Sequence, residues 1–279
     1  MSLNLDIVGK RLEAEPFVYD RDTVILYALG VGAGVETLDY VYEKNLKVLP
    51  TFAVVPFIPM FLSVFVPKAG LNLFKVLHGE QTIVLHRPIE PSGTILTSMV
   101  CESIYDKGDS GAIVNVHLES RNASGDLIFE NRAVIVDRGA GNFGGDRGPK
   151  AEKILPPDGK TPDFRIECPT SQNQAALYRL SGDKNPLHID PAFAKKGGFE
   201  RPILHGLCTY GFAGRAIVQS ACKGEPSRLK SFTARFLNVV FPGETILVEG
   251  WKQDARHYIV QVHAQDGRLV LGNALAEIS

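Results

Sequence analysis

The residues best suited to chemistry lie close together between positions 177 and 212. Asp183 and His188 are five positions apart, and a carboxylate beside an imidazole can move protons to and from water near neutral pH. Asn185 lies between them and precedes Pro186. The residue before a proline is pushed out of the α region, and proline lacks an N–H, so regular helix is disfavoured here. The pattern predicts a proton-transfer pair on a turn.

A glycine follows this turn at a position suited to stabilising negative charge. Gly206 opens the run GLCTYGFAGRAIV, whose apolar spacing predicts a helix. Backbone N–H groups in the first turn of a helix can hold a developing oxyanion. The alternative interpretation of Asp183, Asn185 and His188 is a polar turn with an internally satisfied histidine. Asp190 and the proline after it predict the start of a short helix.

The elements that must position these groups occur twice in the chain. AIVNVH at 112–117 corresponds to YIVQVH at 258–263, and the same glycine-to-asparagine interval separates residues 125 and 131 and residues 267 and 273. Each half shows a helical region followed by alternating β-branched stretches joined by Gly and Asp turns. We therefore predict an α+β duplication with halves 1–137 and 164–279, joined by the Gly- and Pro-rich linker 138–163.

Only one half carries the chemical groups. At the places of Asp183, Asn185 and His188, the first half has Gly32, Gly34 and Thr37, so we expect residues 1–137 to be non-catalytic. The counterpart of the second half's helix is TFAVVPFIPMFLSVFV, with two prolines inside it. A helix broken by prolines would leave apolar space for an acyl chain. Plain core packing is an equally good interpretation.

Composition excludes several classes of function. With 44% apolar and 22% charged residues and a net charge of −1, the chain lacks the broad basic surface that nucleic acids require. The four cysteines show no metal-ligand or disulfide rhythm, and we expect no metal site. The apolar segment 51–66 is interrupted by prolines and shorter than the roughly 20 residues of a membrane helix, so no membrane span is expected.

The motifs LYALGVG, LPTF, KVLHGEQ, SGDKNPLHID and FERPILHG resemble those of the hydratase-2 (MaoC-like) family over essentially the whole chain. The resemblance implies a double hot-dog fold, in which two antiparallel sheets each wrap around a central helix. It also implies reversible syn hydration of a trans-2-enoyl-CoA to the (3R)-3-hydroxyacyl-CoA in fatty-acid β-oxidation. That reaction uses no metal or redox cofactor.

The family's functional positions map onto this sequence residue by residue. The positions matching its catalytic set are Asp183, His188, Asn185 and Gly206. The positions matching its substrate and CoA site are His78, Gly79, Lys107, Lys184, Pro186, Leu187 and Phe236. Glu43 matches a glutamate linked to activity in the family, but no reason for it is visible in the sequence, and it is left out of the set.

Further expectations follow from the resemblance alone. They are an acyl-CoA substrate, fusion to dehydrogenase domains in a parent protein, a homodimer and a peroxisomal location, although the C-terminus ALAEIS carries no SKL-type signal. Two rival functions stay open. One is an acyl-CoA thioesterase, because hot-dog folds also cleave thioesters, and the other is a non-catalytic acyl-CoA binding module.

Overall fold

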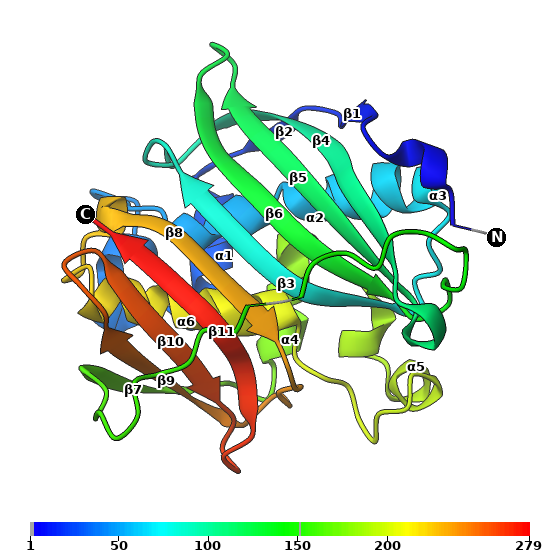
Figure 1. The fold of residues 1–279 in the computed structure, drawn as a ribbon. Helices are drawn as coiled ribbons and strands as arrows, with labels where there is room; N and C mark the ends of the chain where they lie inside the picture. Colours follow the sequence, from blue (N-terminus) through cyan, green and yellow to red (C-terminus); the bar gives the residue numbers. More distant parts are fainter. Residues whose placement is uncertain (1–2, 151) are drawn as a thin grey trace.

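The computed structural model describes all residues except 1–2 and 151 and contains one large antiparallel sheet (Figure 1). The strands of the first half are β1 (Arg11–Glu13), β2 (Phe17–Tyr19), β3 (Val76–Leu85), β4 (Gly93–Asp106), β5 (Ala112–Asn122) and β6 (Leu127–Asp137). Those of the second half are β7 (Phe164–Pro169), β8 (Leu229–Phe236), β9 (Thr245–Lys252), β10 (His257–His263) and β11 (Leu269–Ile278). Their order is β1-β4-β5-β6-β3-β8-β11-β10-β9-β7, and β2 also pairs with β4.

The alternating segments form strands because every second side chain enters the core. In β5 buried and partly exposed residues alternate along most of the strand, as expected for a sheet with one covered face. The hairpins β5–β6 and β10–β11 turn at Gly125 and Gly267, whose φ angles are 87° and 86°. The two glycines thus have the same backbone conformation in the two halves, which confirms the predicted repeat.

The two half-sheets are joined edge to edge. Strands β3 and β8 pair antiparallel, from Glu80 opposite Arg235 to Val84 opposite Ser231. The sequence predicted two sheets, each around its own helix. The structure keeps that plan but makes the sheet continuous, because β3 and β8 each end a half-sheet and pairing satisfies their exposed backbone groups.

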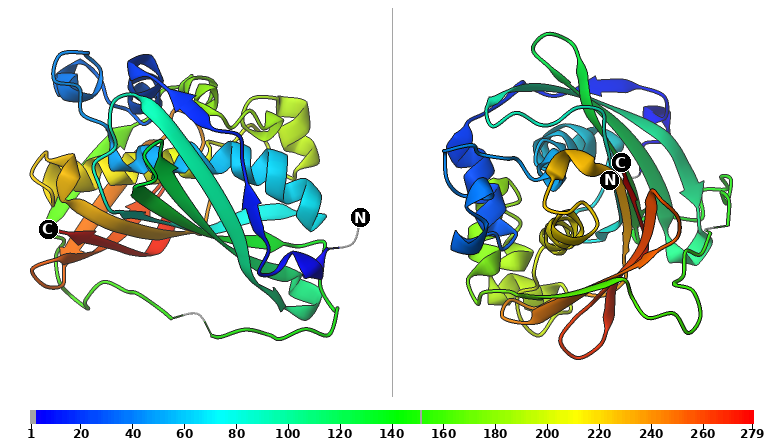
Figure 2. Two further views of the ribbon diagram at one scale, coloured as in Figure 1. Left: turned by 90° about the horizontal axis from the view of Figure 1, so that it is seen from above. Right: turned by 90° about the vertical axis from the view of Figure 1, so that its left-hand side faces the viewer.

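Each half-sheet wraps around one central helical run, and the two runs lie side by side within the curved sheet (Figure 2, right). In the second half this is α6 (Gly206–Ser220), which begins at the predicted glycine. In the first half the run consists of η3 (Pro50–Val54), α2 (Phe57–Pro59), the π-helical η4 (Met60–Phe65) and α3 (Val66–Ala69).

The expectation that prolines break the first helix was wrong. Pro56 and Pro59 precede α2 and η4 as their N-cap residues, where a missing N–H costs nothing, and the run changes from 3-10 to α to π turns without ending. Among the described residues, Pro50–Ala69 is the one helix long and apolar enough to cross a membrane. However, 67% of its apolar stretch is buried inside the protein.

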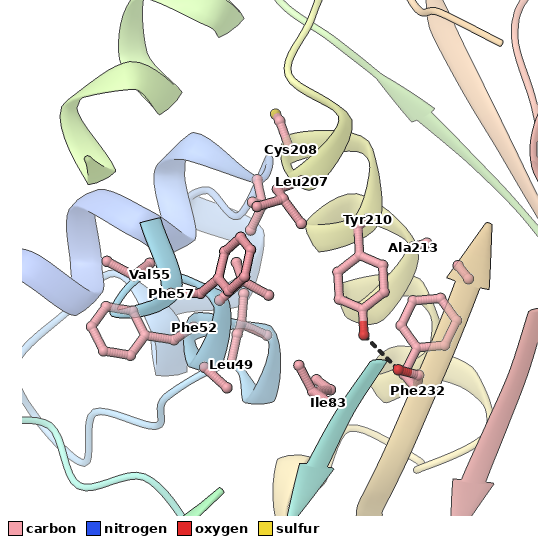
Figure 3. Packing of buried hydrophobic residues seen from close by; sticks show 14 of the residues in the cluster. Leu49, Phe52, Val55, Phe57, Ile83, Leu207, Cys208, Tyr210, Ala213 and Phe232 are labelled. Carbon is pink, nitrogen blue, oxygen red and sulfur yellow. Dashed lines mark hydrogen bonds between the residues drawn. The ribbon is translucent and has the colours of Figure 1, made fainter. Parts of the chain in front are cut away.

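The two central helices pack closely because α6 carries small residues on the facing side. A Cβ on Gly214 would lie 2.3 Å from Thr51 of the first central run, and one on Gly211 would lie 2.4 Å from Val31, the C-cap residue of α1. Beside this contact Tyr210 donates its hydroxyl proton to the carbonyl oxygen of Phe232 in β8 at 2.6 Å (Figure 3). The first half therefore rests directly on the helix that begins at the candidate site.

The other helices cover the open side of the sheet and its ends. They are η1 (Leu5–Ile7), α1 (Arg21–Gly30), η2 (Val35–Tyr40), η5 (Gly108–Ser110), α4 (Gln174–Tyr178), η6 (Arg179–Ser181), η7 (Pro186–His188), α5 (Pro191–Lys196) and η8 (Pro226–Arg228). The described part of 138–163 contains neither helix nor strand and runs across the outer face of the sheet (Figure 2, left). Ile154 in this segment donates its N–H to Oδ1 of Asn273 in β11 at 2.6 Å.

Candidate active site

The Asp183–His188 segment is a turn held by its own side chains. Oδ1 of Asp183 accepts the N–H of Asn185 at 3.1 Å, and Oδ1 of Asn185 accepts the N–H of Leu187 at 3.0 Å. Asn185 is thus the N-cap of η7, and Pro186 is its first residue, where proline is favoured. The turn carries His188 into the protein interior while Asp183 stays partly exposed. The hydrogen bonds of Asn185 therefore support the turn.

His188 is oriented for proton transfer. Its side chain is buried, and Nδ1 lies 2.9 Å from the carbonyl oxygen of Ile203. A carbonyl only accepts, so Nδ1 carries the proton and Nε2 is the nitrogen left for chemistry. Burial lowers the pKa of His188 below its ordinary value, although the Asp183 carboxylate opposes this shift. At neutral pH the ring is therefore uncharged and can accept a proton.

A second histidine lies against the first. The rings of His205 and His188 are stacked with 3.7 Å between centroids, and Nε2 of His205 lies 3.0 Å from the backbone oxygen of Asp183. Burial, followed by repulsion from His188, lowers the pKa of His205 to about 2. Both imidazoles are consequently neutral.

One ligand-type atom each from Asp183, His188 and His205 lies within 4.8 Å of the other two. A water bonded to two groups at about 2.8 Å joins atoms roughly 4.5 Å apart, so one water fits between the carboxylate and the His188 ring. A metal fits less well. The two rings are stacked with 29° between their planes, whereas histidines that bind one metal ion point their in-plane nitrogen lone pairs at a common point.

Gly206 connects this group to the first half of the protein. It is the first residue of α6, where the N–H has no acceptor within the helix, and it is exposed. A Cβ here would lie 3.1 Å from the ring of Phe236. That ring packs against His78 at 4.9 Å, and His78 packs against Phe57 of α2 at 5.5 Å. Gly206, Phe236 and His78 therefore form one wall contributed by both halves.

The other predicted substrate positions have different surroundings, and not all of them lie near Asp183. Burial lowers the pKa of His78 to about 4, so its ring is neutral. Gly79 lies at a β-bulge of β3, and a Cβ there would lie 3.1 Å from the backbone oxygen of Val134. Close packing of β6 thus explains this glycine without a ligand. Lys107 donates to the backbone oxygen of Arg147 in the linker, and no contact joins it to the Asp183 group among the described residues.

The remaining predicted positions surround the turn itself. Lys184 and Pro186 are exposed, while Leu187 is partly buried and approaches Gly197 after α5. The predicted start of α5 is confirmed, because Oδ1 of Asp190 accepts the N–H of Ala192 at 2.8 Å. These residues form the rim of the turn on the side of α5.

From the sequence alone, no role was predicted for the His205 ring or for Phe74. Phe74 is 75% exposed, and its ring stacks on Phe193 of α5 with 5.4 Å between centroids. It lies four residues before His78, as Phe193 lies five after His188. The sequence signal for Phe74 was its position as an aromatic residue directly before the KVLHGEQ motif.

The first half cannot reproduce the site at the equivalent place. The counterpart of Asp183 is Gly32, whose φ is 81°, and a Cβ there would lie 2.2 Å from the ring of Phe212 in α6. A side chain at this position would need both a strained backbone and a displaced core residue. The geometry agrees with the expectation of one proton-transfer group per chain.

The family model described as MaoC like domain matches residues 153–272, and the MFE-2 hydratase 2 N-terminal domain matches residues 17–139. The chain is 39% identical to a probable enoyl-CoA hydratase 2 of Dictyostelium discoideum, over 98% of this chain and 95% of that protein. It is 40% identical to mouse peroxisomal multifunctional enzyme type 2, over 97% of this chain but only 38% of that protein. It is 41% identical to 3-hydroxyacyl-thioester dehydratase Y of Mycobacterium tuberculosis, over 99% of both.

Solved structures give the same assignment. A MaoC-like dehydratase from Phytophthora capsici superposes with a TM-score of 0.88 at 31% identity, covering 99% of each chain. A Mycobacterium tuberculosis protein described as a double hotdog fold superposes with a TM-score of 0.66 at 14% identity, over 97% of this chain and 95% of that one, which supports the fold alone. The predicted double hot-dog architecture is thereby confirmed, and the chain belongs to the MaoC-like hydratase-2 family.

Proposed function

We propose that the protein is an (R)-specific 2-enoyl-CoA hydratase, a hydro-lyase that adds water syn across a trans-2-enoyl-CoA to give the (3R)-3-hydroxyacyl-CoA. The observation that carries the proposal is the position of Asp183 and His188, which bring a carboxylate oxygen and an imidazole nitrogen within 4.8 Å of each other in the turn that packs against His205, the residue before α6. A single water held there has a base on either side and an oxyanion donor nearby.

The chemistry requires three groups. A base takes a proton from the water that attacks C3, an acid delivers a proton to C2, and a donor stabilises the enolate-like thioester oxygen between these steps. Asp183 and neutral Nε2 of His188 exchange the protons, and the N–H of Gly206 faces the oxygen. The product contains the substrate plus one water with no net oxidation, so the proposal includes no metal or redox cofactor.

The two halves take different roles in this proposal. Residues 164–279 carry the reaction, and residues 1–137 are non-catalytic, which is supported by the packing of Phe212 against Gly32. The first half contributes His78 to the wall beside Gly206, and the linker 138–163 connects the halves. Lys107, Lys184, Pro186 and Leu187 are proposed to contact the CoA part of the substrate, because they match the family's CoA-site positions.

Assembly and location are further parts of the proposal. The match to 31% of a peroxisomal hydratase-dehydrogenase-epimerase of Neurospora crassa supports fusion to dehydrogenase domains. The relatives include peroxisomal and bacterial proteins, so a peroxisomal location and a homodimer stay predictions. Sedimentation of the purified protein tests the dimer, and microscopy of a fluorescent fusion tests the location.

The deciding experiment follows the enoyl-thioester absorbance of trans-2-decenoyl-CoA, with chiral analysis of the product. Asp183→Asn and His188→Gln should each lower kcat by about 10²- to 10⁴-fold, because each removes a proton-transfer group. His257→Gln is the matched control, since His257 lies at the surface beside Asp254, and it should keep full activity.

Two outcomes would replace the proposal. Release of free CoA by the wild-type protein would make it a thioesterase. Saturable binding of the enoyl-CoA without turnover, at any chain length, would make it a binding module.

A further inference from the structure

His205 is a deeply buried titratable side chain at the site and has no assigned part in the reaction. Only 1% of its surface is exposed. It is the N-cap residue of α6, yet its side chain makes no capping hydrogen bond. N-cap side chains ordinarily bond to the first N–H groups of their helix. Here Nε2 instead reaches back to the backbone oxygen of Asp183 at 3.0 Å.

The imidazole of His205 packs against two other rings. His188 lies on it with 3.7 Å between centroids, and Tyr178 lies 5.0 Å away at 53°. Tyr178 is completely buried, so His205 cannot move away from His188 in that direction without displacing core. The stacked ring therefore restricts the plane in which His188 can lie.

The hydrogen bond fixes the protonation of His205. Because the backbone oxygen of Asp183 only accepts, Nε2 carries the proton, and in the neutral ring Nδ1 carries none. That Nδ1 is buried without a partner among the described residues. Burial, followed by the effects of His188 and Arg179, lowers the pKa of His205 and keeps the ring neutral, although the hydrogen bond to the Asp183 backbone opposes this shift. A neutral ring stacks on His188 without charge repulsion in the state competent for catalysis.

We infer that His205 is a positioning residue that joins the two parts of the site: its Nε2–H fixes the backbone of Asp183, its ring fixes the plane of His188, and its main chain continues into Gly206. This inference rests on the proposed hydratase function for its kinetic consequence. One side chain thereby sets the distance between the water-holding pair and the oxyanion donor, both of which must meet the same substrate.

The test separates the hydrogen bond from the stacking. His205→Phe keeps a ring beside His188 but removes the donor, and His205→Gln keeps a donor at a comparable reach but removes the ring. His257→Phe is the control for a histidine-to-phenylalanine change outside the site. Activity is measured with trans-2-decenoyl-CoA and normalised to folded protein by circular dichroism.

We expect His205→Phe to lower kcat by about 10- to 100-fold with KM changed less than about 3-fold, because misplacement of a catalytic group affects the transition state most. His205→Gln should recover part of this loss. An unchanged kcat per folded molecule in both variants would reduce His205 to a packing residue and overturn the inference.

A second readout does not depend on turnover. Nitrogen NMR of the imidazoles, with His188 assigned through His188→Gln, reports the tautomer and titration of His188. The wild type should show His188 protonated at Nδ1, and His205→Phe should shift its signals and its titration midpoint. An unchanged His188 spectrum in both variants would refute the positioning role. A shifted spectrum in a protein that hydrates nothing would instead retain the positioning role and refute the hydratase proposal.

Discussion

The hydroxyl groups of Thr82 and Thr233 share a hydrogen bond of 2.9 Å, directly opposite each other on β3 and β8. They occupy the middle of the five residue pairs that join the half-sheets, and Glu80 and Arg235 form an ion pair at 3.0 Å at one end. The His78–Phe236 contact lies beyond the Glu80 end, so this seam also positions the site wall.

The two single substitutions of the pair should together cost more than the double substitution. Thr82→Val or Thr233→Val leaves the other hydroxyl partly buried without its partner, and each should lower the free energy of unfolding by about 1–2 kcal/mol. The double variant should lose less than the sum, because both polar groups are gone. Urea unfolding measures this, with Thr94→Val on β4 as the control. Strictly additive losses would show that the hydroxyls do not interact.

Gly206→Ala should impair catalysis through Phe236. The new Cβ would lie 3.1 Å from the phenylalanine ring, so either the ring or the first turn of α6 must move. We expect kcat to fall roughly 10- to 100-fold as the oxyanion donor is displaced. Combining it with Phe236→Leu should restore part of the rate, with Phe236→Leu alone as the reference. If kcat of the double variant is no higher than that of Gly206→Ala, the contact with Phe236 is not the cause of the loss.

The activity should persist into mildly acidic solution. Burial lowers the pKa of His188, so its neutral form remains below the ordinary imidazole value of about 6.5. As pH falls through the lowered value the ring gains a proton and kcat/KM declines. A pH profile of kcat/KM should therefore show its acidic midpoint below about 6.5. A midpoint above that value would contradict the assigned environment of His188.

Folding stability should also decrease in acid because of His205. Its pKa is about 2 in the folded protein and about 6.5 when unfolded, so between these values the unfolded chain binds one more proton. Stability then falls as pH falls, by about 1.4 kcal/mol per pH unit from this residue. The free energy of unfolding, measured from denaturation curves, should fall less for His205→Phe than for the wild type between about pH 5.5 and 4.5. Equal losses would mean that His205 is protonated in the folded state.

Gly32→Ala should destabilise the protein strongly. Its φ of 81° disfavours any Cβ, and the Phe212 ring would lie 2.2 Å from that atom. We expect a loss of roughly 2–4 kcal/mol in the free energy of unfolding. Gly144→Ala is the matched control, because Gly144 has a similar φ of 78° but open space around it, and it should cost about 1 kcal/mol. Similar losses of stability in the two variants would show that the contact with Phe212 does not cause the effect of Gly32→Ala.

The features of the site that could be predicted from the sequence are those determined by patterns within a few neighbouring residues. Spacing around Asp183, Asp190 and Gly206 predicted the turn, the start of α5 and the start of α6, because caps, prolines and apolar periodicity act over a few residues. The stacking of His205 on His188 could not be predicted, since it depends on the approach of two segments 17 residues apart (205 minus 188) in three dimensions. The unbroken first helix was missed because each proline could be accommodated by a change of helical turn type.

The course of the linker has a consequence for how the molecule could be divided. The described part of 138–163 runs outside the sheet, whereas contacts that hold the halves together come from β3, β8 and α6. The connection mainly supplies a high effective concentration of one half for the other. Two separately expressed polypeptides, divided within this segment, would then be expected to reassemble as a heterodimer whose activity depends on concentration.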